Sequence, residues 1–453
     1  MLILQDALPN IKTFLKPVTL GRRAEALLIR CMVAFLMHFG RMSAAQAAGA
    51  IRTQARHRAQ ISRFLGRTYW KRTDLLGPLR AALLEREAQQ DGTFLFTVDQ
   101  TLCSSQAQRN ENTFRCGNYR KRPRKSQRRQ KKTARRSAHC FVMGLLITPS
   151  GIRIPYFQSF YTRDYCRKKH LDFRTQAELG AQLIRQLPVP EGARVIVLGD
   201  TAFEAQSIRA ACAFRKFSWI MPVNPERVLA GAKPRPKVTS LAKELHADQM
   251  VRLEVHPSRG PYVAYRRMAR CRIGPKLKPR TYSVHQEIRE VHSVGRVRLV
   301  FSTTNAPTQG HRVDVQKILM TNDESLSHQD ISELYQLRWQ IELFFKELKS
   351  TLGLDRYRFR QFERVENWVR LVLATFLYLE WVRAGQLRKR SLTAKQRAWW
   401  QAQRTYGLAG AVRQSAEQKE LDLLADALET PAGRRRLSKL LGQSHPKEYR
   451  VAI

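Results

Sequence analysis

The sequence contains no long run of apolar residues. Its two longest candidates, residues 26–39 and 369–382, are each broken by an ionisable side chain, Arg30 in the first and Glu380 in the second. A helix needs about 20 apolar residues to cross a bilayer, so we expect no membrane association. Secretion signals begin with a basic region that is followed by an apolar stretch, and the first residues of this sequence contain no such basic region. These absences predict a cytoplasmic protein.

Familiar cysteine motifs and nucleotide-binding glycine motifs are absent as well. The seven cysteines are spread singly, and no CxxC pair occurs. We therefore expect reduced, buried thiols, and the spacing of Cys and His matches no familiar zinc site. The glycine fingerprints of dinucleotide and P-loop sites are also missing. The sequence thus argues against a disulfide scaffold, a structural zinc protein and these nucleotide-binding classes.

Acidic residues are scarce, and this scarcity points to a polyanionic partner. The chain has 37 Asp and Glu against 81 Lys and Arg, a formal net charge of +44 at pH 7. Such an excess favours binding to DNA or RNA. The charge peaks in residues 115–136, which contain twelve Lys and Arg. This segment cannot bury a core, so we expect a basic loop that adds non-specific affinity for DNA.

Composition and periodicity divide the chain into segments. Residues 1–90 are predicted helical, and either a helix-turn-helix unit or a small packed bundle fits them. Residues 91–221 have buried strands, 222–320 have the alternating pattern of half-exposed antiparallel strands, and 321–385 are mostly helical. Residues 386–453 are predicted to be helical and charged. The whole is a mixed α/β protein with helical ends.

Two predicted strands lead into aspartates. Residues 93–98 form a β-prone run followed by Asp99, and residues 194–198 form another that leads to Asp200. Residues 140–160 are predicted to form a β-hairpin about a Pro-Ser-Gly turn. Each aspartate also has a simpler interpretation. Asp99 is equally placed to cap a turn, and Asp200 to cap a helix.

The stretch YQLRWQIELFFKELKS, residues 335–350, is predicted to be an amphipathic helix with three surfaces. Its core stripe consists of Leu334, Leu337, Ile341, Phe344, Phe345, Leu348 and Leu352. A polar edge beside this stripe consists of Tyr335, Arg338, Glu342 and Lys349. The solvent-facing side consists of Gln336, Gln340, Lys346 and Glu347. The assignment follows from 100° per residue. A plain salt bridge between Arg338 and Glu342 is the alternative to a functional edge.

These observations place three carboxylates where they can converge. Asp99 and Asp200 would lie at one edge of a sheet, and Glu342 would face them from the helix. Converging carboxylates repel one another unless cations separate them, and oxygen ligands suit Mg²⁺ or Mn²⁺. Two such ions can promote displacement at phosphorus. The sequence therefore suggests a metal-dependent phosphodiester chemistry.

The helix resembles one protein family in detail. Its Tyr-x2-Arg-x3-Glu-x6-Lys pattern is similar to the signature of a large group of bacterial insertion-sequence DDE transposases. Two further blocks resemble the aspartate motifs of that group: Asp99, Gln100 and Thr101, and Asp200, Thr201, Ala202 and Phe203. The similarity covers roughly residues 93–385. It implies a ribonuclease H-like catalytic domain that is interrupted by a β-rich insertion.

The resemblance also implies roles for individual residues. Asp99, Asp200 and Glu342 would hold two Mg²⁺ ions, with Mn²⁺ as a possible substitute, while Tyr335, Arg338 and Lys349 would grip DNA phosphates. The implied partners are double-stranded transposon ends and target DNA, bound by a homodimer in a synaptic complex at the nucleoid.

The reaction implied is nicking at the element's end, followed by attack of the freed 3′-hydroxyl, in cut-and-paste transposition. Relatives often form hairpinned ends with a tryptophan of the insertion. Here no Trp lies between Trp219 and Trp339, so the hairpin step stays open, with Tyr262, Tyr265 or Tyr282 as substitutes. A transposase-derived protein that binds DNA without cutting it is the alternative function.

Overall fold

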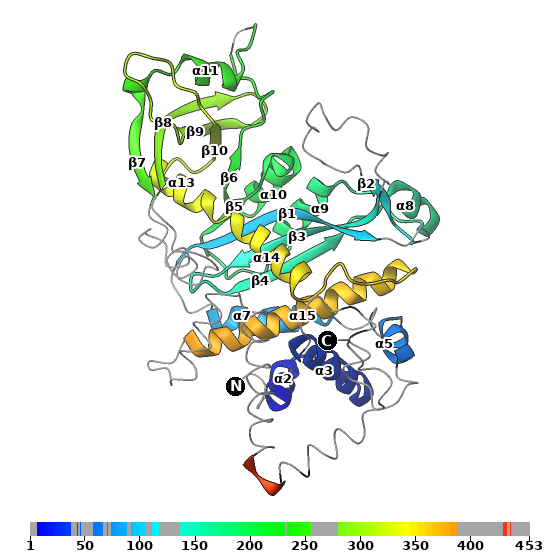
Figure 1. Ribbon diagram of the computed structural model, residues 1–453. Coiled ribbons are helices and arrows are strands. Elements are labelled where there is room, and N and C mark those ends of the chain that lie inside the picture. Colours follow the sequence, from blue (N-terminus) through cyan, green and yellow to red (C-terminus); the bar gives the residue numbers. More distant parts are fainter. Residues whose placement is uncertain are drawn as a thin grey trace, which may run out of the picture.

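The computed structural model describes residues 7–37, 43, 46, 58–66, 70, 74–87, 92–105, 110–116, 136–231, 233–255, 280–387, 429–432 and 435. The predicted turn at 52–57, most of the basic loop, Tyr262, Tyr265 and most of the C-terminal region lie outside these residues. Within them, ten strands form one mixed sheet with helices on both sides (Figure 1).

The first four strands form an antiparallel group. They are β1 (Phe94–Ser105), β2 (Phe114–Cys116), β3 (Arg136–Ile147) and β4 (Arg153–Ser159). The predicted hairpin is confirmed, because β3 pairs antiparallel with β4. The prediction that the first strand ends at Asp99 is wrong. β1 continues to Ser105 because its second half remains paired with β3.

Two parallel strands complete the central part of the sheet. β5 (Val195–Leu198) pairs parallel with β1, and β6 (Ser218–Pro222) pairs parallel with β5. The order β4-β3-β1-β5-β6 combines an antiparallel group with two parallel strands, as in a ribonuclease H-like fold. The predicted fold class is confirmed. Short helices fill the connections: α8 (Arg163–Lys169), α9 (Gln176–Arg185), η3 (Thr201–Phe203) and α10 (Gln206–Phe214).

Neighbouring residues of β3 show which helices cover which face. The Cys140 thiol accepts a hydrogen bond from Gln176 of α9 at 3.5 Å. The next residue, Phe141, stacks on Phe362 of α15 (Phe362–Leu387) with ring centroids 6.1 Å apart. Because side chains alternate along a strand, α9 and α15 cover opposite faces. Asp99 pairs with Met143, which is on the same face as Phe141, and so points to the α15 side.

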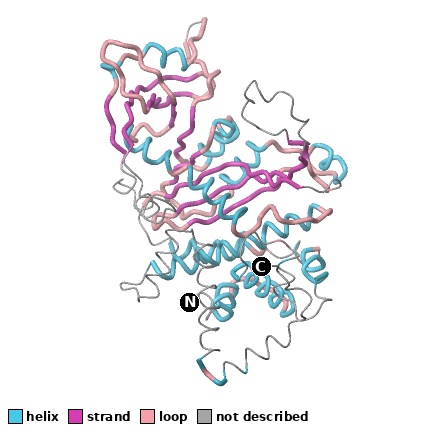
Figure 2. Tube along the Cα trace, in the orientation of Figure 1, coloured by secondary structure: helices cyan, strands magenta, loops and turns pink. Residues whose placement is uncertain are grey.

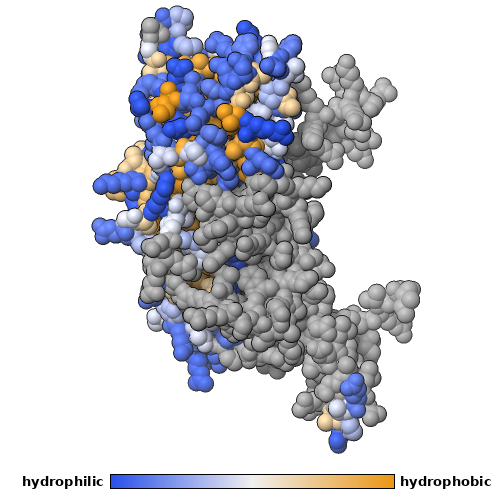
Figure 3. Space-filling model, turned by 90° about the vertical axis from the view of Figure 1, so that its left-hand side faces the viewer, coloured by the Kyte–Doolittle hydropathy of each residue, from blue (hydrophilic) through white to orange (hydrophobic). Residues whose placement is uncertain are grey.

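The β-rich insertion extends the same sheet. Its elements are α11 (Val238–Glu244), η4 (Ala247–Gln249), β7 (Val251–Val255), β8 (Arg280–Val291), β9 (Gly295–Thr303) and β10 (Lys317–Thr321). β10 pairs antiparallel with both β9 and β6. Figure 2 shows the strands of the insertion and of the central sheet in one colour. Turned by 90°, the insertion presents a largely hydrophilic face with small hydrophobic patches (Figure 3).

The segment predicted as one helix over 335–350 is two helices, so that prediction is wrong in part. α13 (His328–Gln336) and α14 (Trp339–Ser350) are separated by a tight step at Leu337 and Arg338. The Arg338 N–H donates to the Tyr335 carbonyl at 3.1 Å, the three-residue spacing of a 3₁₀ turn. Ser327 caps α13 through a capping box with Asp330.

The predicted core stripe of these two helices is confirmed, since every member is buried. The predicted solvent-facing side is wrong at one position. Glu347 is buried, because Arg153 of β4 lies 3.0 Å from its carboxylate. A helix wheel cannot anticipate a partner that comes from a distant strand.

The N-terminal helices pack beneath α15. They are α2 (Ala7–Leu15), α3 (Arg22–Met37), α5 (Arg58–Leu65) and α7 (Leu76–Glu87). The rings of Phe35 and Trp368 are 5.2 Å apart, and the Asn367 amide donates to the Leu65 carbonyl at 2.7 Å. The described helices thus pack as a bundle, and the turn of the predicted helix-turn-helix lies outside the described residues.

Candidate functional site

The parallel register of β1 and β5 places Asp99 and Asp200 side by side. Phe94 pairs with Val195 and Thr97 with Leu198, and the same register carried two residues further puts Asp99 opposite Asp200. β5 has ended by then, so Asp99 lies where its parallel neighbour stops. Asp200 caps η3, and its carboxylate accepts hydrogen bonds from the N–H groups of Ala202 and Phe203 at 2.9 and 3.2 Å. The capping interpretation of Asp200 is confirmed.

The start of α14 faces these strand positions. The Tyr335 hydroxyl donates to the Gly199 carbonyl at 3.3 Å, directly before Asp200. Arg338 donates to the Glu342 carboxylate at 2.7 Å, and its guanidinium also lies 3.9 Å from the Asp99 carboxylate. One guanidinium therefore connects the helix glutamate with the strand aspartate.

The electrostatics of Asp99 show that the three carboxylates interact. The pKa of Asp99 is raised to about 6, first by burial and then by the negative charge of Asp200; Glu342 adds a smaller contribution. A hydrogen bond from the Gln100 N–H at 2.7 Å and the charge of Arg338 oppose this rise. The carboxylates thus carry more mutual repulsion than Arg338 removes.

The remaining predicted residue lies further along β1. Lys349, near the end of α14, donates to the Leu102 carbonyl at 2.9 Å. This contact is beyond Asp99 in the direction of the strand. Tyr335, Arg338, Glu342 and Lys349 therefore follow the line where α13 and α14 meet β1 and the end of β5, with Tyr335 buried and the other three half-buried.

One residue of this region was missed by the sequence argument. Lys317, the first residue of β10, has its ammonium nitrogen 4.3 Å from the centre of the Tyr335 ring. Its pKa is lowered, first by burial and then by the positive charge of Arg338, while Glu342 opposes this shift. No motif marks Lys317. Only the pairing of β10 with β6 places it here.

The donor set suits a divalent cation, but it is not assembled around one. Carboxylate oxygens are the preferred ligands of Mg²⁺, and the raised pKa of Asp99 shows negative charge that a cation would neutralise. Among the described residues, no three His, Cys, Asp or Glu side chains are close enough together to hold a metal ion. Glu342 is instead engaged by Arg338.

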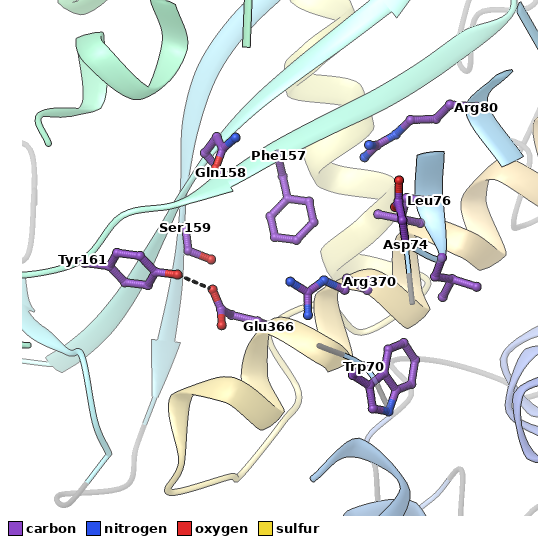
Figure 4. Close-up of a pocket in the computed structure, with 11 residues that line it drawn as sticks. Trp70, Asp74, Leu76, Arg80, Phe157, Gln158, Ser159, Tyr161, Glu366 and Arg370 are labelled. Atoms are coloured by element: carbon purple, nitrogen blue, oxygen red, sulfur yellow. Dashed lines mark hydrogen bonds between the residues drawn. The ribbon is translucent and has the colours of Figure 1, made fainter. Parts of the chain in front are cut away.

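A cavity between the helices and the sheet lies apart from these residues. A space of about 440 Å³ opens between α7, β4 and α15 (Figure 4), where the Tyr161 hydroxyl donates to Glu366 at 2.9 Å. None of the six predicted site residues lines it. The carboxylate region is thus separate from this cavity.

No helix in the described part of the chain is long and apolar enough to cross a membrane.

Comparisons with known proteins agree on a family. Residues 174–378 match the model of a family described as "Transposase DDE domain", a range that includes Asp200 and Glu342 but not Asp99. The chain is 41% identical over 63 residues to the "Putative transposase InsL for insertion sequence element IS186A" of Escherichia coli (strain K12). The same identity holds for the "Transposase for insertion sequence element IS421" of Escherichia coli.

Each of these alignments covers 13% of this chain and 17% of the relative. The match to these relatives is therefore local, whereas the family model extends across β5, the insertion and α14. Residues 174–378 thus match a transposase DDE domain, and the strand order of the sheet is that of a ribonuclease H-like fold.

Proposed function

We propose that the chain cuts and joins phosphodiester bonds at transposon ends, with Asp99, Asp200 and Glu342 as its catalytic carboxylates. The observation that carries the proposal is the strand register that sets Asp99 opposite Asp200, together with Arg338, whose guanidinium connects Asp99 with Glu342. Their family context supports a nuclease-type reaction on DNA. Cut-and-paste transposition by a homodimer on two ends, at the nucleoid, is the form we propose.

The carboxylates would hold two Mg²⁺ ions, with Mn²⁺ as a possible substitute. When bound, such ions supply activation of a water or 3′-hydroxyl and stabilisation of the leaving oxygen. Glu342 must first be released by Arg338, whose guanidinium then becomes available to a DNA phosphate. Tyr335 and Lys349 would contact further phosphates along the same line. The hairpin step depends on a stacking residue, for which Tyr282 of β8 is a described candidate.

Substitution of the carboxylates tests the proposal. Asp200→Ala and Glu342→Ala should each reduce Mg²⁺-dependent cleavage of duplex DNA carrying the element's ends by at least about 10³-fold. Binding of the same DNA should persist in both variants. Lys346→Ala, on the exposed side of α14, is the matched control. Unchanged cleavage in either variant would remove the site assignment. Binding without cleavage by the unaltered protein would favour the non-catalytic alternative.

The basic segment tests the DNA partner separately. Its described ends are adjacent, since Cys116 of β2 pairs with Arg136 of β3. Residues 117–135 can therefore be replaced by an Asn-Gly turn, which suits a two-residue hairpin connection. We expect weaker binding to any duplex, with a salt dependence that flattens by about 0.9 per lost phosphate contact. Loss of end recognition alone would show instead that the segment reads bases.

A further inference from the structure

Lys317 joins the insertion to the site. It begins β10, the strand that pairs with β9 of the insertion on one side and with β6 of the catalytic domain on the other. Its ammonium group lies over the Tyr335 ring at 4.3 Å. A cation held over an aromatic face is attracted by the ring electrons. The insertion thereby contributes a positive charge at the end of α13.

Two cations share this ring. The guanidinium of Arg338 lies 5.9 Å from the same ring centre, but it is committed to Glu342. Lys317 forms no ion pair with a described carboxylate, and the residue is exposed. Two positive charges beside the same ring repel each other unless an anion lies between or beside them. Although the residue as a whole is exposed, partial burial of its ammonium end lowers the pKa of Lys317, and the positive charge of Arg338 lowers it further.

A DNA phosphate would relieve this repulsion. The three carboxylates make the neighbourhood unfavourable for a phosphodiester, so cations are needed on the side from which DNA approaches. Lys349 supplies one beyond Asp99, at the Leu102 carbonyl. Lys317 supplies one at the opposite end of the line, next to Tyr335. The two lysines thus flank the carboxylates from different elements.

We propose that Lys317 is a DNA-contacting residue whose ammonium group binds a phosphate of the duplex beside the catalytic carboxylates, with the Tyr335 ring as its platform. This inference rests on the proposed function and adds to it a contact from the insertion. The ligand is a phosphodiester of double-stranded DNA.

The test compares charge removal with charge retention. Lys317→Gln removes the positive charge, Lys317→Arg retains it, and Lys346→Gln is the matched control on the exposed side of α14. Affinity for duplex DNA carrying the element's end is measured without Mg²⁺ between about 50 and 200 mM salt. For Lys317→Gln we expect about tenfold weaker binding at low salt and a salt dependence flattened by about 0.9. Lys317→Arg and Lys346→Gln should keep the slope of the unaltered protein.

Binding and cleavage separate this inference from the proposed function. A Lys317→Gln variant with an unchanged salt slope overturns the phosphate contact. An equal loss of binding in Lys317→Gln and Lys317→Arg, with the slope unchanged, also overturns it, because Lys317 would then only support Tyr335. Failure of the unaltered protein to cleave, with normal binding, rejects catalysis but leaves the binding test of Lys317 intact. Failure to bind duplex DNA overturns both proposals.

Discussion

Helix α14 carries two glutamates with contrasting surroundings. Glu342 lies at its start, where the side chain is 33% exposed and pairs with the half-buried Arg338. Glu347 lies one and a half turns later, is buried, and faces Arg153. Both glutamates have an arginine partner within 3.0 Å. Their difference lies in what surrounds the pair.

Glu347, Glu380, Arg153 and Arg383 form a buried cluster, called here the inner cluster, with two negative and two positive side chains. Arg153 bonds through its backbone N–H and its guanidinium to Glu380 of α15, which is fully buried. Arg383 adds a second guanidinium to Glu380 and donates to the Gly151 carbonyl at 2.9 Å. Two carboxylates thus face two guanidiniums across β4, α14 and α15. Removing one member would leave a buried charge without its partner.

The outer cluster consists of Asp99, Asp200, Glu342 and Arg338. It has three carboxylates for one guanidinium, and its side chains are half-buried. Asp99 and Glu342 both face Arg338, and the pKa of Asp99 is raised first by burial and then by the negative charge of Asp200. The ammonium group of Lys317 adds a second positive charge, which lies over the Tyr335 ring and forms no ion pair with a described carboxylate. The comparison teaches that one helix can carry similar ion pairs in an enclosed core and at a solvent-accessible edge.

The sharpest way to break the comparison is Glu342→Gln. We expect cleavage of end-containing DNA to fall by at least about 10³-fold, because the variant removes a proposed metal ligand. The free energy of unfolding should change by less than about 1 kcal/mol, since half-exposed ion pairs contribute little. Cleavage rates and urea unfolding measure the two effects. A large loss of stability would show that Glu342 belongs with the inner cluster.

The converse variant is Glu380→Gln. It leaves Arg153 and Arg383 short of a buried carboxylate, so the free energy of unfolding should fall by roughly 3–5 kcal/mol. Urea unfolding measures this loss, and DNA cleavage per folded molecule should stay near that of the unaltered protein. A loss below about 1 kcal/mol would mean that the inner cluster contributes little to the stability of the fold.

The third variant, Asp99→Asn, should stabilise the protein above neutral pH. Folding raises the pKa of Asp99 from 3.8 to about 6, so ionised Asp99 destabilises the fold. This penalty is absent below about pH 4, grows between pH 4 and 6 and is complete above pH 6. Asn removes it, which corresponds to a gain of roughly 3 kcal/mol at pH 8.

Unfolding free energies at pH 4 and pH 8, without divalent cations, test this expectation. Asp314→Asn is the control, because Asp314 is exposed. A gain for Asp99→Asn that is equal at both pH values would contradict the electrostatic origin of the effect. Added Mg²⁺ should stabilise the unaltered protein and leave Asp99→Asn largely unchanged.

Local sequence predicted the elements better than their junctions. The strand before Asp200, the hairpin over β3 and β4 and the Ser327 cap follow from periodicity and short-range signals. The extension of β1 past Asp99 does not, because it depends on pairing with β3 across a long connection. The step at Leu337 and Arg338 contains neither Gly nor Pro, so nothing in the local sequence marks it.

The candidate site shows the same division. The motif spacing and the wheel identified Arg338 and Glu342, whose pairing is local. Lys317 and the burial of Glu347 were not predictable, since each depends on a strand distant in sequence. Tertiary pairing decides which charged residues meet a helix, and a single sequence does not display it.

The antiparallel ladder between β6 and β10 has a mechanical consequence. It makes the insertion part of the same hydrogen-bonded sheet as β5, the strand that precedes Asp200. If DNA binds the insertion as proposed, a force on the insertion would be carried along the β10–β6–β5 hydrogen bonds toward Asp200. Bending of the DNA would then deform the sheet, and the same deformation would change the alignment of the carboxylates.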